Sequence, residues 1–186
     1  VIISSIVEDT YYLWSKFMDQ ITDQNFTSIV GGVFVTYYPQ IFDGQVDYIC
    51  RGEGDEVIPE LMDLISDNKD GHHLANIYPN DMRPAIDVNT LPSTDHEIFD
   101  KRSLYRPFQG RIIKVATVET QRGCPFRCKF CNSPSNARLY KEETDSLFFR
   151  HRSVEHIEKE IQHLIKTIDV EFLWIVTDTL LTTSKK

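Results

Sequence analysis

Three of the chain's four cysteines lie within eight residues, at Cys124, Cys128 and Cys131, in a C-x3-C-x2-C spacing. Thiolates that are close in sequence on a flexible loop are the usual ligands of an iron–sulfur cluster. Three protein ligands leave one iron of a 4Fe-4S cube open, and an open metal position can bind a substrate or a cofactor. The spacing therefore predicts a 4Fe-4S cluster with one vacant coordination position.

Structural zinc is the alternative metal for these cysteines. It usually takes four ligands from paired C-x2-C units, and the sequence has no second pair. His151 could complete a zinc site, although its spacing from the cysteines is unusual. Cys50 lies 74 residues before Cys124 and ends an apolar run, so it is predicted to be a buried core thiol. Clustered thiols favour a metal site in a reducing compartment over a disulfide scaffold.

The stretch from Arg122 to Cys131 reads RGCPFRCKFC. It closely resembles the signature of radical S-adenosylmethionine (SAM) enzymes. The resemblance implies that the open iron chelates the amino and carboxylate groups of SAM. It also implies that an electron from the cluster cleaves SAM to methionine and a 5′-deoxyadenosyl radical, and that Phe130 packs near the adenine.

A weaker likeness to the same family continues downstream. Residues Val176–Leu180 (VTDTL) resemble the end of the second strand of the radical SAM barrel, where paired acids are usual. Thr177 replaces the first of those acids, and the resemblance assigns Asp178 to SAM binding. Residues 150–153 (RHRS), which precede a predicted helix, also fit the family.

Three short elements upstream resemble the cobalamin-binding domain that precedes the radical SAM domain in one large subfamily. They are a Ser-x-Leu-like element, a Gly-Gly pair and an Arg-Gly-Glu-Gly-acid stretch. The resemblance implies cobalamin contacts at Ser4, Ser5, Gly31, Gly32, Gly52, Glu53 and Gly54. Taken alone, glycines at the ends of predicted strands are explained better by plain strand-to-helix turns.

The apolar pattern of residues 1–67 predicts alternating strands and helices. Strands are expected at Val1–Ile6, Ser28–Val35 and Asp47–Cys50, with helices between and after them. Such alternation implies a parallel sheet, whose ligands bind at the carboxyl ends of the strands. We therefore expect an α/β fold in which residues 1–67 form the C-terminal part of a Rossmann-like cobalamin-binding domain.

Residues 68–110 are punctuated by proline and turn residues, which predicts a linker with short strands such as Ala85–Val88. Residues 111–186 resume the alternation, with a helix capped by Ser153 followed by the strand Phe172–Val176. One and a half strand–helix units cannot close a barrel. The resemblance therefore implies the N-terminal part of a radical SAM domain, the start of a (β/α) partial barrel.

The net charge of −8 conceals a basic segment around the cysteines, because residues 101–152 hold 12 Lys and Arg against 4 Asp and Glu. Arginines near a thiolate cluster offset its negative charge and bind carboxylates. The acidic chain as a whole argues against nucleic acid as a partner. No apolar run approaches the ~18 residues of a membrane span, and the first residues lack the features of a signal peptide. We expect a cytoplasmic protein without a membrane partner.

The resemblance implies cobalamin-dependent radical SAM catalysis on a small-molecule substrate, with a flavodoxin or ferredoxin as the reducing partner. Methyl transfer to an unactivated carbon is one outcome in the subfamily, and ring formation and rearrangement are others. One alternative is a catalytically incomplete fragment that binds only a cluster, because the ends at Val1 and Lys186 look cut from a longer chain. Another is a radical SAM enzyme without cobalamin, such as a methylthiotransferase. Those enzymes carry three further upstream cysteines, whereas residues 1–110 contain only Cys50.

Overall fold

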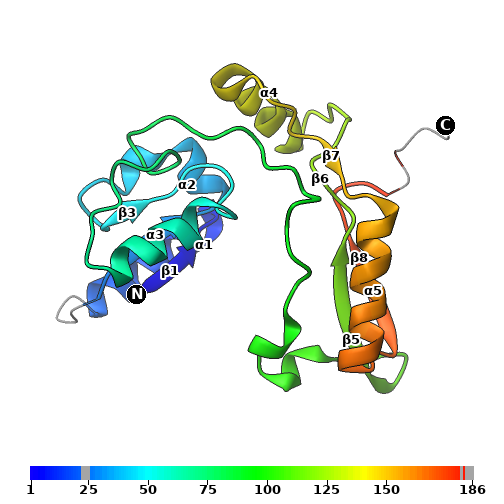
Figure 1. The fold of residues 1–186 in the computed structure, drawn as a ribbon. Coiled ribbons are helices and arrows are strands. Elements are labelled where there is room, and N and C mark those ends of the chain that lie inside the picture. Colours follow the sequence, from blue (N-terminus) through cyan, green and yellow to red (C-terminus); the bar gives the residue numbers. More distant parts are fainter. Residues whose placement is uncertain (22–25, 181, 183–186) are drawn as a thin grey trace. The chain divides into compact units, whose positions relative to one another are not determined.

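The chain forms two compact units, residues 1–85 and residues 86–186. The computed structural model describes residues 1–21, 26–180 and 182 (Figure 1). The segment that the sequence assigns to a linker, 68–110, spans the boundary between the two units. Among the described residues, no helix has both the length and the apolar character needed to cross a membrane.

The first unit is built on a three-stranded parallel sheet in the order β1-β2-β3 (Figure 1). Helices follow each strand, as expected for right-handed crossovers between parallel strands. In chain order the elements are β1 (Ile2–Ser5), α1 (Glu8–Gln20), β2 (Ser28–Gly31), α2 (Val33–Tyr37), the 3-10 turn η1 (Pro39–Ile41), β3 (Tyr48–Ile49) and α3 (Val57–Ser66).

Alternate residues of β2 enter the two cores on either face of this sheet. Ile29 packs with Val57 and Leu61 of α3, whereas Val30 packs with Trp14 of α1 and Val35 of α2. Helices on both faces of a parallel sheet are the arrangement of a doubly wound, Rossmann-like fold. The predicted α/β class is therefore confirmed.

The strand predicted at Ser28–Val35 ends early, at Gly31, because α2 begins at Val33. Gly32 makes the turn with a φ of 103°, and a Cβ there would lie 2.9 Å from both Ile6 N and Ile6 O. Only glycine fits such a conformation against a neighbouring backbone. The strand-to-helix turn thus accounts for Gly32 without a ligand.

The second unit is built on a mixed sheet in the order β4-β5-β8. The central strand β5 pairs antiparallel with β4 and parallel with β8, and a two-stranded ribbon, β6 with β7, stands beside them. The described strands of this unit close no barrel. In chain order, its elements are the 3-10 turns η2 (His96–Ile98) and η3 (Lys101–Leu104), followed by β4 (Tyr105–Phe108), β5 (Arg111–Glu119), β6 (Gln121–Arg122), α4 (Ser133–Thr144), β7 (Arg150–His151), α5 (Val154–Ile168) and β8 (Phe172–Val176).

Helix α5 covers one face of the β5–β8 pair, where Leu164 and Ile168 pack against Ala116 and Val118 (Figure 1). The helix begins as predicted, because the Ser153 Oγ accepts a hydrogen bond from the His156 N–H at 3.1 Å. This crossover brings β8 alongside β5 in parallel. The carboxyl ends of the two strands therefore lie together, next to the start of the cysteine loop.

The strand predicted at Ala85–Val88 is absent, because these residues form no ladder with another strand. The Ile86 carbonyl instead accepts a hydrogen bond from the Arg150 guanidinium at 2.7 Å. The Val88 side chain is fully buried. Residues 86–88, which belong to the second unit, are thus held by side-chain contacts rather than by a sheet.

Candidate site at the cysteine loop

The cysteine loop, residues 123–132, connects β6 to α4 at the carboxyl ends of β5 and β8. Ligands of parallel sheets bind at this edge. A cavity of about 440 Å³ opens there, a volume typical of small-molecule sites. Its lining comes from four segments: Glu119, Gln121, Arg122 and Gly123; Cys131, Asn132, Ser133 and Asn136; Phe148; and Val176, Thr177 and Asp178.

The three cysteines of the predicted triad are free thiols with different surroundings. Cys124 is half-buried, while Cys128 and Cys131 are exposed. The Cys131 N–H donates to the Cys128 carbonyl at 3.2 Å, so these two residues share one turn. Cys124 instead lines a second cavity, of about 670 Å³, on a different side of α4. Within the described part of the chain, no three His, Cys, Asp or Glu side chains converge closely enough to hold a metal ion.

The donor chemistry of the loop still suits an iron–sulfur cluster. Three thiols lie on a segment without regular secondary structure, and soft thiolates are the ligands that such clusters use. The Ser133 N–H at the start of α4 donates to the Cys131 Sγ at 3.4 Å. Hydrogen bonds to ligand sulfurs tune the reduction potential of a cluster. His151, the residue considered for zinc, lies in β7 with its ring 4.5 Å from that of Phe149.

The start of the loop is fixed by close packing at Gly123. Its φ is 80°, and a Cβ there would lie 2.8 Å from the Phe148 carbonyl oxygen and 2.9 Å from Phe148 Cδ1. The Phe148 ring stacks on Tyr140 of α4 with centroids 5.1 Å apart. Residues Gln121 and Arg122 pair with His151 and Arg150 across the β6–β7 ribbon. The backbone that leads into Cys124 is therefore held on two sides.

Arg152 anchors the end of β5, and its position could not be read from the sequence. Its Nη1 donates to the Glu119 carbonyl at 2.6 Å, and its N–H donates to the Thr120 carbonyl at 3.0 Å. The side chain of Arg152 is 7% exposed and faces the Glu160 side chain, which is 1% exposed. An arginine in a polar stretch is normally assigned to the surface, so nothing in the sequence marked this one as internal.

The cavity holds charges of both signs. Arg122 and Glu119 form an ion pair with Nε 3.0 Å from Oε2, and their side chains are 23% and 41% exposed. Asp178, just beyond the end of β8, adds a second carboxylate to the lining. A guanidinium can bind a carboxylate, and carboxylates can bind an ammonium group. The arrangement thus suits a zwitterionic ligand such as an amino acid.

The structure places the two residues assigned to SAM differently. Asp178 lines the cavity, as its place at the end of β8 leads one to expect. The Phe130 side chain is 95% exposed and is not among the residues that line this cavity. Its ring is therefore open to contact but lies outside the lining of this cavity.

The residues assigned to cobalamin gather at one edge of the first unit's sheet. Ser4, Ser5 and Gly31 are the last residues of β1 and β2, Gly32 follows β2 directly, and residues 52–54 follow β3. The buried Thr36 fixes the stretch after β3, because its Oγ1 accepts from the Gly52 N–H at 3.0 Å. The Asn76 amide donates to the Glu53 carbonyl at 2.8 Å. No sequence pattern marked Thr36 and Asn76 as supports of this stretch, because each contacts backbone groups of a segment that is distant in sequence.

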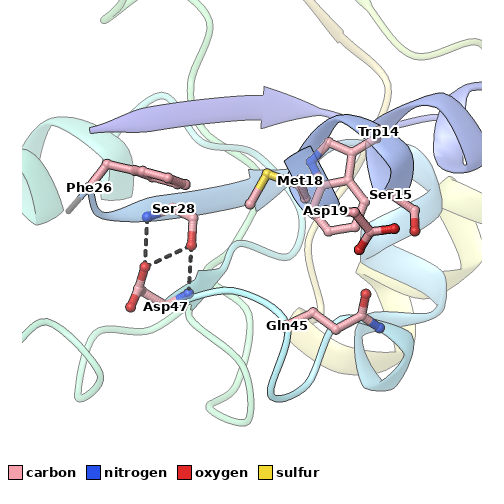
Figure 2. A pocket seen from close by; sticks show the side chains of 8 residues that line it. All are labelled: Trp14, Ser15, Met18, Asp19, Phe26, Ser28, Gln45 and Asp47. Atoms are coloured by element: carbon pink, nitrogen blue, oxygen red, sulfur yellow. Dashed lines mark hydrogen bonds between the residues drawn. The ribbon is translucent and has the colours of Figure 1, made fainter. Parts of the chain in front are cut away.

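A further pocket of the first unit lies at the opposite edge of the sheet, where β2 and β3 begin (Figure 2). Figure 2 shows Asp47 beside Ser28, and the Asp47 Oδ2 accepts from both Ser28 N and Ser28 Oγ at 2.7 Å. These bonds hold the starts of the two strands in register. The pocket contains none of the predicted site residues and lies away from the edge where such sheets bind ligands.

Comparisons with known proteins found relatives among enzymes. No family model matches the chain, and no solved structure matches it. The chain is 25% identical over 178 residues to an uncharacterized methyltransferase of Pyrococcus horikoshii, which covers 88% of the chain and 36% of that protein. It is 25% identical over 137 residues to the bacteriochlorophyllide d C-8(2)-methyltransferase of Chlorobaculum tepidum, which covers 74% of the chain and 29% of that protein.

A third relative is the anaerobic magnesium-protoporphyrin IX monomethyl ester cyclase of Rubrivivax gelatinosus. It is 26% identical over 164 residues, which cover 78% of the chain and 27% of that protein. The chain thus spans between about a quarter and somewhat more than a third of the length of these relatives. Its similarity is to methyltransferases and a cyclase, which supports an enzymatic function.

Proposed function

We propose that the chain forms part of a radical SAM enzyme in which Cys124, Cys128 and Cys131 hold a 4Fe-4S cluster. The observation that carries the proposal is the RGCPFRCKFC loop at the carboxyl ends of two parallel strands, beside a cavity lined by Cys131. Residues 111–186 would be the N-terminal part of the radical SAM domain. The loop would gather its sulfurs around the cluster, because no regular element restrains it.

SAM is the ligand proposed for the cavity. When bound, the cluster supplies the electron that cleaves SAM to methionine and a 5′-deoxyadenosyl radical. The chain's own residues would bind and orient the amino-acid group, Arg122 through its guanidinium and Asp178 through its carboxylate. The exposed Phe130 ring would cover the adenine. A flavodoxin or ferredoxin would deliver the electron.

Cobalamin is the second cofactor that we propose, held by residues 1–67 as the C-terminal part of a cobalamin-binding domain. Its contacts would be Ser4, Ser5, Gly31, Gly32, Gly52, Glu53 and Gly54. Their common place at the carboxyl edge of a parallel sheet supports the assignment. Methyl transfer to a carbon of a small-molecule substrate is the reaction we favour, because two of the relatives are methyltransferases.

Anaerobic reconstitution with iron and sulfide tests the cluster. We expect about four irons per chain, absorbance near ~400 nm and, after reduction, release of 5′-deoxyadenosine from SAM. Cys128→Ala should lose the cluster, whereas Cys50→Ala should keep it, because Cys50 lies in the core of the first unit. A chain that holds no iron, or holds it without cleaving SAM, would contradict the proposal.

Equilibrium dialysis with hydroxocobalamin tests the second cofactor separately. Binding to the unmodified chain and its loss in a Gly54→Val variant are the expected results. Gly44→Val is the control, because Gly44 lies before β3, outside the predicted set, and a Cβ there would meet nothing within 4 Å. The φ of Gly44 is 72°, so this variant also carries backbone strain, and its folding must be checked by its thermal midpoint. Equal binding by both variants would count against the assigned contacts.

A further inference from the structure

Two buried polar groups at the cavity beside Cys131 have no hydrogen-bond partner among the described residues. They are the Gln121 Nε2 and the Ser133 Oγ. Gln121 is 5% exposed and Ser133 is 8% exposed, and both residues line this cavity. A buried donor without a partner lowers the stability of a fold, and such groups are rare in native structures. Two of them at one cavity therefore call for a physical reason.

The backbone of each of these two residues is fixed by contacts with neighbouring residues. Gln121 lies in β6, paired with His151, and its Oε1 accepts a long hydrogen bond from Thr182 Oγ1 at 3.4 Å. Ser133 opens α4, and its N–H donates to the Cys131 Sγ. The two groups thus come from separate elements and reach the same space. Both residues line the cavity, and their unpartnered polar atoms are buried there.

We propose that Gln121 and Ser133 are binding residues for the ligand of this cavity, and that they contact the polar atoms of the amino-acid group of SAM. This inference rests on the proposed function. Gln121 would donate from Nε2 to a carboxylate oxygen, and the Ser133 hydroxyl would donate to or accept from a neighbouring polar atom. The amide and the hydroxyl add neutral contacts to the charges of Arg122 and Glu119. Neutral groups that need a partner discriminate against ligands that lack one.

The competing explanation is an ordered water that satisfies both groups in the absence of any ligand. The two explanations differ in what a substitution does. If a ligand supplies the partner, deleting the polar atom weakens ligand binding. The same deletion removes an unpaired buried group from the ligand-free chain, so it does not lower the stability of that chain. If a bound water supplies it, the deletion leaves ligand binding unchanged.

Gln121→Met and Ser133→Ala test the inference in the reconstituted chain. Met keeps the length of the Gln side chain without its polar atoms, and Ala removes only the hydroxyl. We expect SAM to bind about tenfold more weakly to each variant in equilibrium dialysis, which is the loss of one buried hydrogen bond. The change that SAM makes in the electron paramagnetic resonance spectrum of the reduced cluster should then need a higher SAM concentration.

The thermal midpoint of the metal-free chain is the second readout. It should stay the same or rise in both variants, because the Gln121 Nε2 and the Ser133 Oγ have no partner in the ligand-free state and the bond lost at the Gln121 Oε1 is long, 3.4 Å from Thr182 Oγ1. The matched controls are Gln162→Met, whose exposed amide donates to Glu158 on α5, and Ser135→Ala on α4. Neither control should change SAM binding.

Three results would overturn the inference. The first is wild-type affinity for SAM in both variants. The second is a lower thermal midpoint of the metal-free chain together with weaker binding, which would indicate a merely structural role. The third is the absence of SAM binding in the unmodified, cluster-containing chain, which would overturn the proposed function as well. The first two results leave that function standing, so the two failures can be told apart.

Discussion

Arg152 and Glu160 form a buried ion pair, in which the Arg152 Nη2 lies 2.5 Å from the Glu160 Oε2. The two side chains are 7% and 1% exposed. The other Glu160 oxygen, Oε1, accepts from the Thr94 N–H at 3.3 Å, and Arg152 Nη1 donates to the Glu119 carbonyl. The pair therefore joins the end of β5, helix α5 and the segment before η2.

Removing one member of this pair should destabilise the second unit strongly. Glu160→Gln leaves the Arg152 charge buried without a counter-charge, and such a change typically costs about 3–5 kcal/mol of unfolding free energy. Chemical denaturation of the metal-free chain measures it. Lys141→Gln is the control, because it breaks the exposed Lys141–Asp145 pair and should leave the unfolding free energy unchanged. Equal losses in both variants would refute the structural role of the buried pair.

Gly123→Ala should lower the cluster content of the reconstituted chain. The added Cβ would meet the Phe148 carbonyl and ring, so the backbone before Cys124 must shift. Gly110→Ala is the matched control, because Gly110 also has a positive φ, 74°, yet a Cβ there would meet nothing within 4 Å. Both variants carry the left-handed backbone penalty of about 1–2 kcal/mol. Only Gly123→Ala should lose iron, and an equal loss of iron in both would show that backbone strain alone is responsible.

Cys50 should be the slowest of the four thiols to react. Burial raises the pKa of the Cys50 thiol to about 11, so almost none of it is thiolate at neutral pH. Alkylation of the metal-free chain with iodoacetamide should modify Cys124, Cys128 and Cys131 first, and Cys50 only after unfolding. Peptide mass spectrometry locates the modified residues. Early modification of Cys50 would contradict its position in the core, which the sequence predicted and its 3% exposure confirms.

His72 and Asp70 should make the stability of the first unit depend on pH. Their hydrogen bond, 2.5 Å between Nδ1 and Oδ1, raises the pKa of His72 from 6.5 and lowers the pKa of Asp70 from 3.8. The His72 contribution is fully present below pH 6.5 and is lost as the pH rises through its raised pKa. The Asp70 contribution is present above pH 3.8 and is lost as the pH falls through its lowered pKa.

The thermal midpoint should therefore fall as the pH rises above 6.5 and through the raised pKa of His72, because the pair is lost there. His72→Gln should reduce that fall, whereas His73→Gln, at the exposed neighbouring residue, should not. If both variants keep the full pH dependence of the unmodified chain, other groups are responsible.

Strands and helices with a clear apolar pattern could be predicted from the sequence. Strand β8 has the predicted bounds, Phe172–Val176, and α5 begins at its Ser153 cap. Helix α4 was missed because its sequence, Ser133–Thr144, has few apolar residues and no apolar stripe. The two-residue strands β6 and β7 are too short to produce any periodicity. Their pairing depends on contacts between residues about thirty positions apart.

The cysteines of the candidate site could be identified from their spacing, but the residues that support them could not. Glu160 lies among charged residues of α5, where a solvated face is the ordinary expectation. It is buried because Arg152 and Thr94 cover it, and Thr94 lies 66 residues away in sequence. Gln121 is buried for a similar reason, at a ribbon that no local pattern predicts. Such positions follow from tertiary contacts rather than from local sequence.

The two tryptophans of the chain fall one in each unit, and their surroundings differ. Trp14 is 8% exposed in the core of the first unit, whereas Trp174 is 61% exposed on β8 of the second. Intrinsic fluorescence should therefore report mainly on the first unit, because the shielded Trp14 indole emits at shorter wavelength than a hydrated one and shifts when that unit unfolds. Replacing Trp174 with Phe leaves Trp14 as the single reporter, so comparing its transition with the loss of helical signal from the whole chain can reveal whether the two halves melt together or in turn.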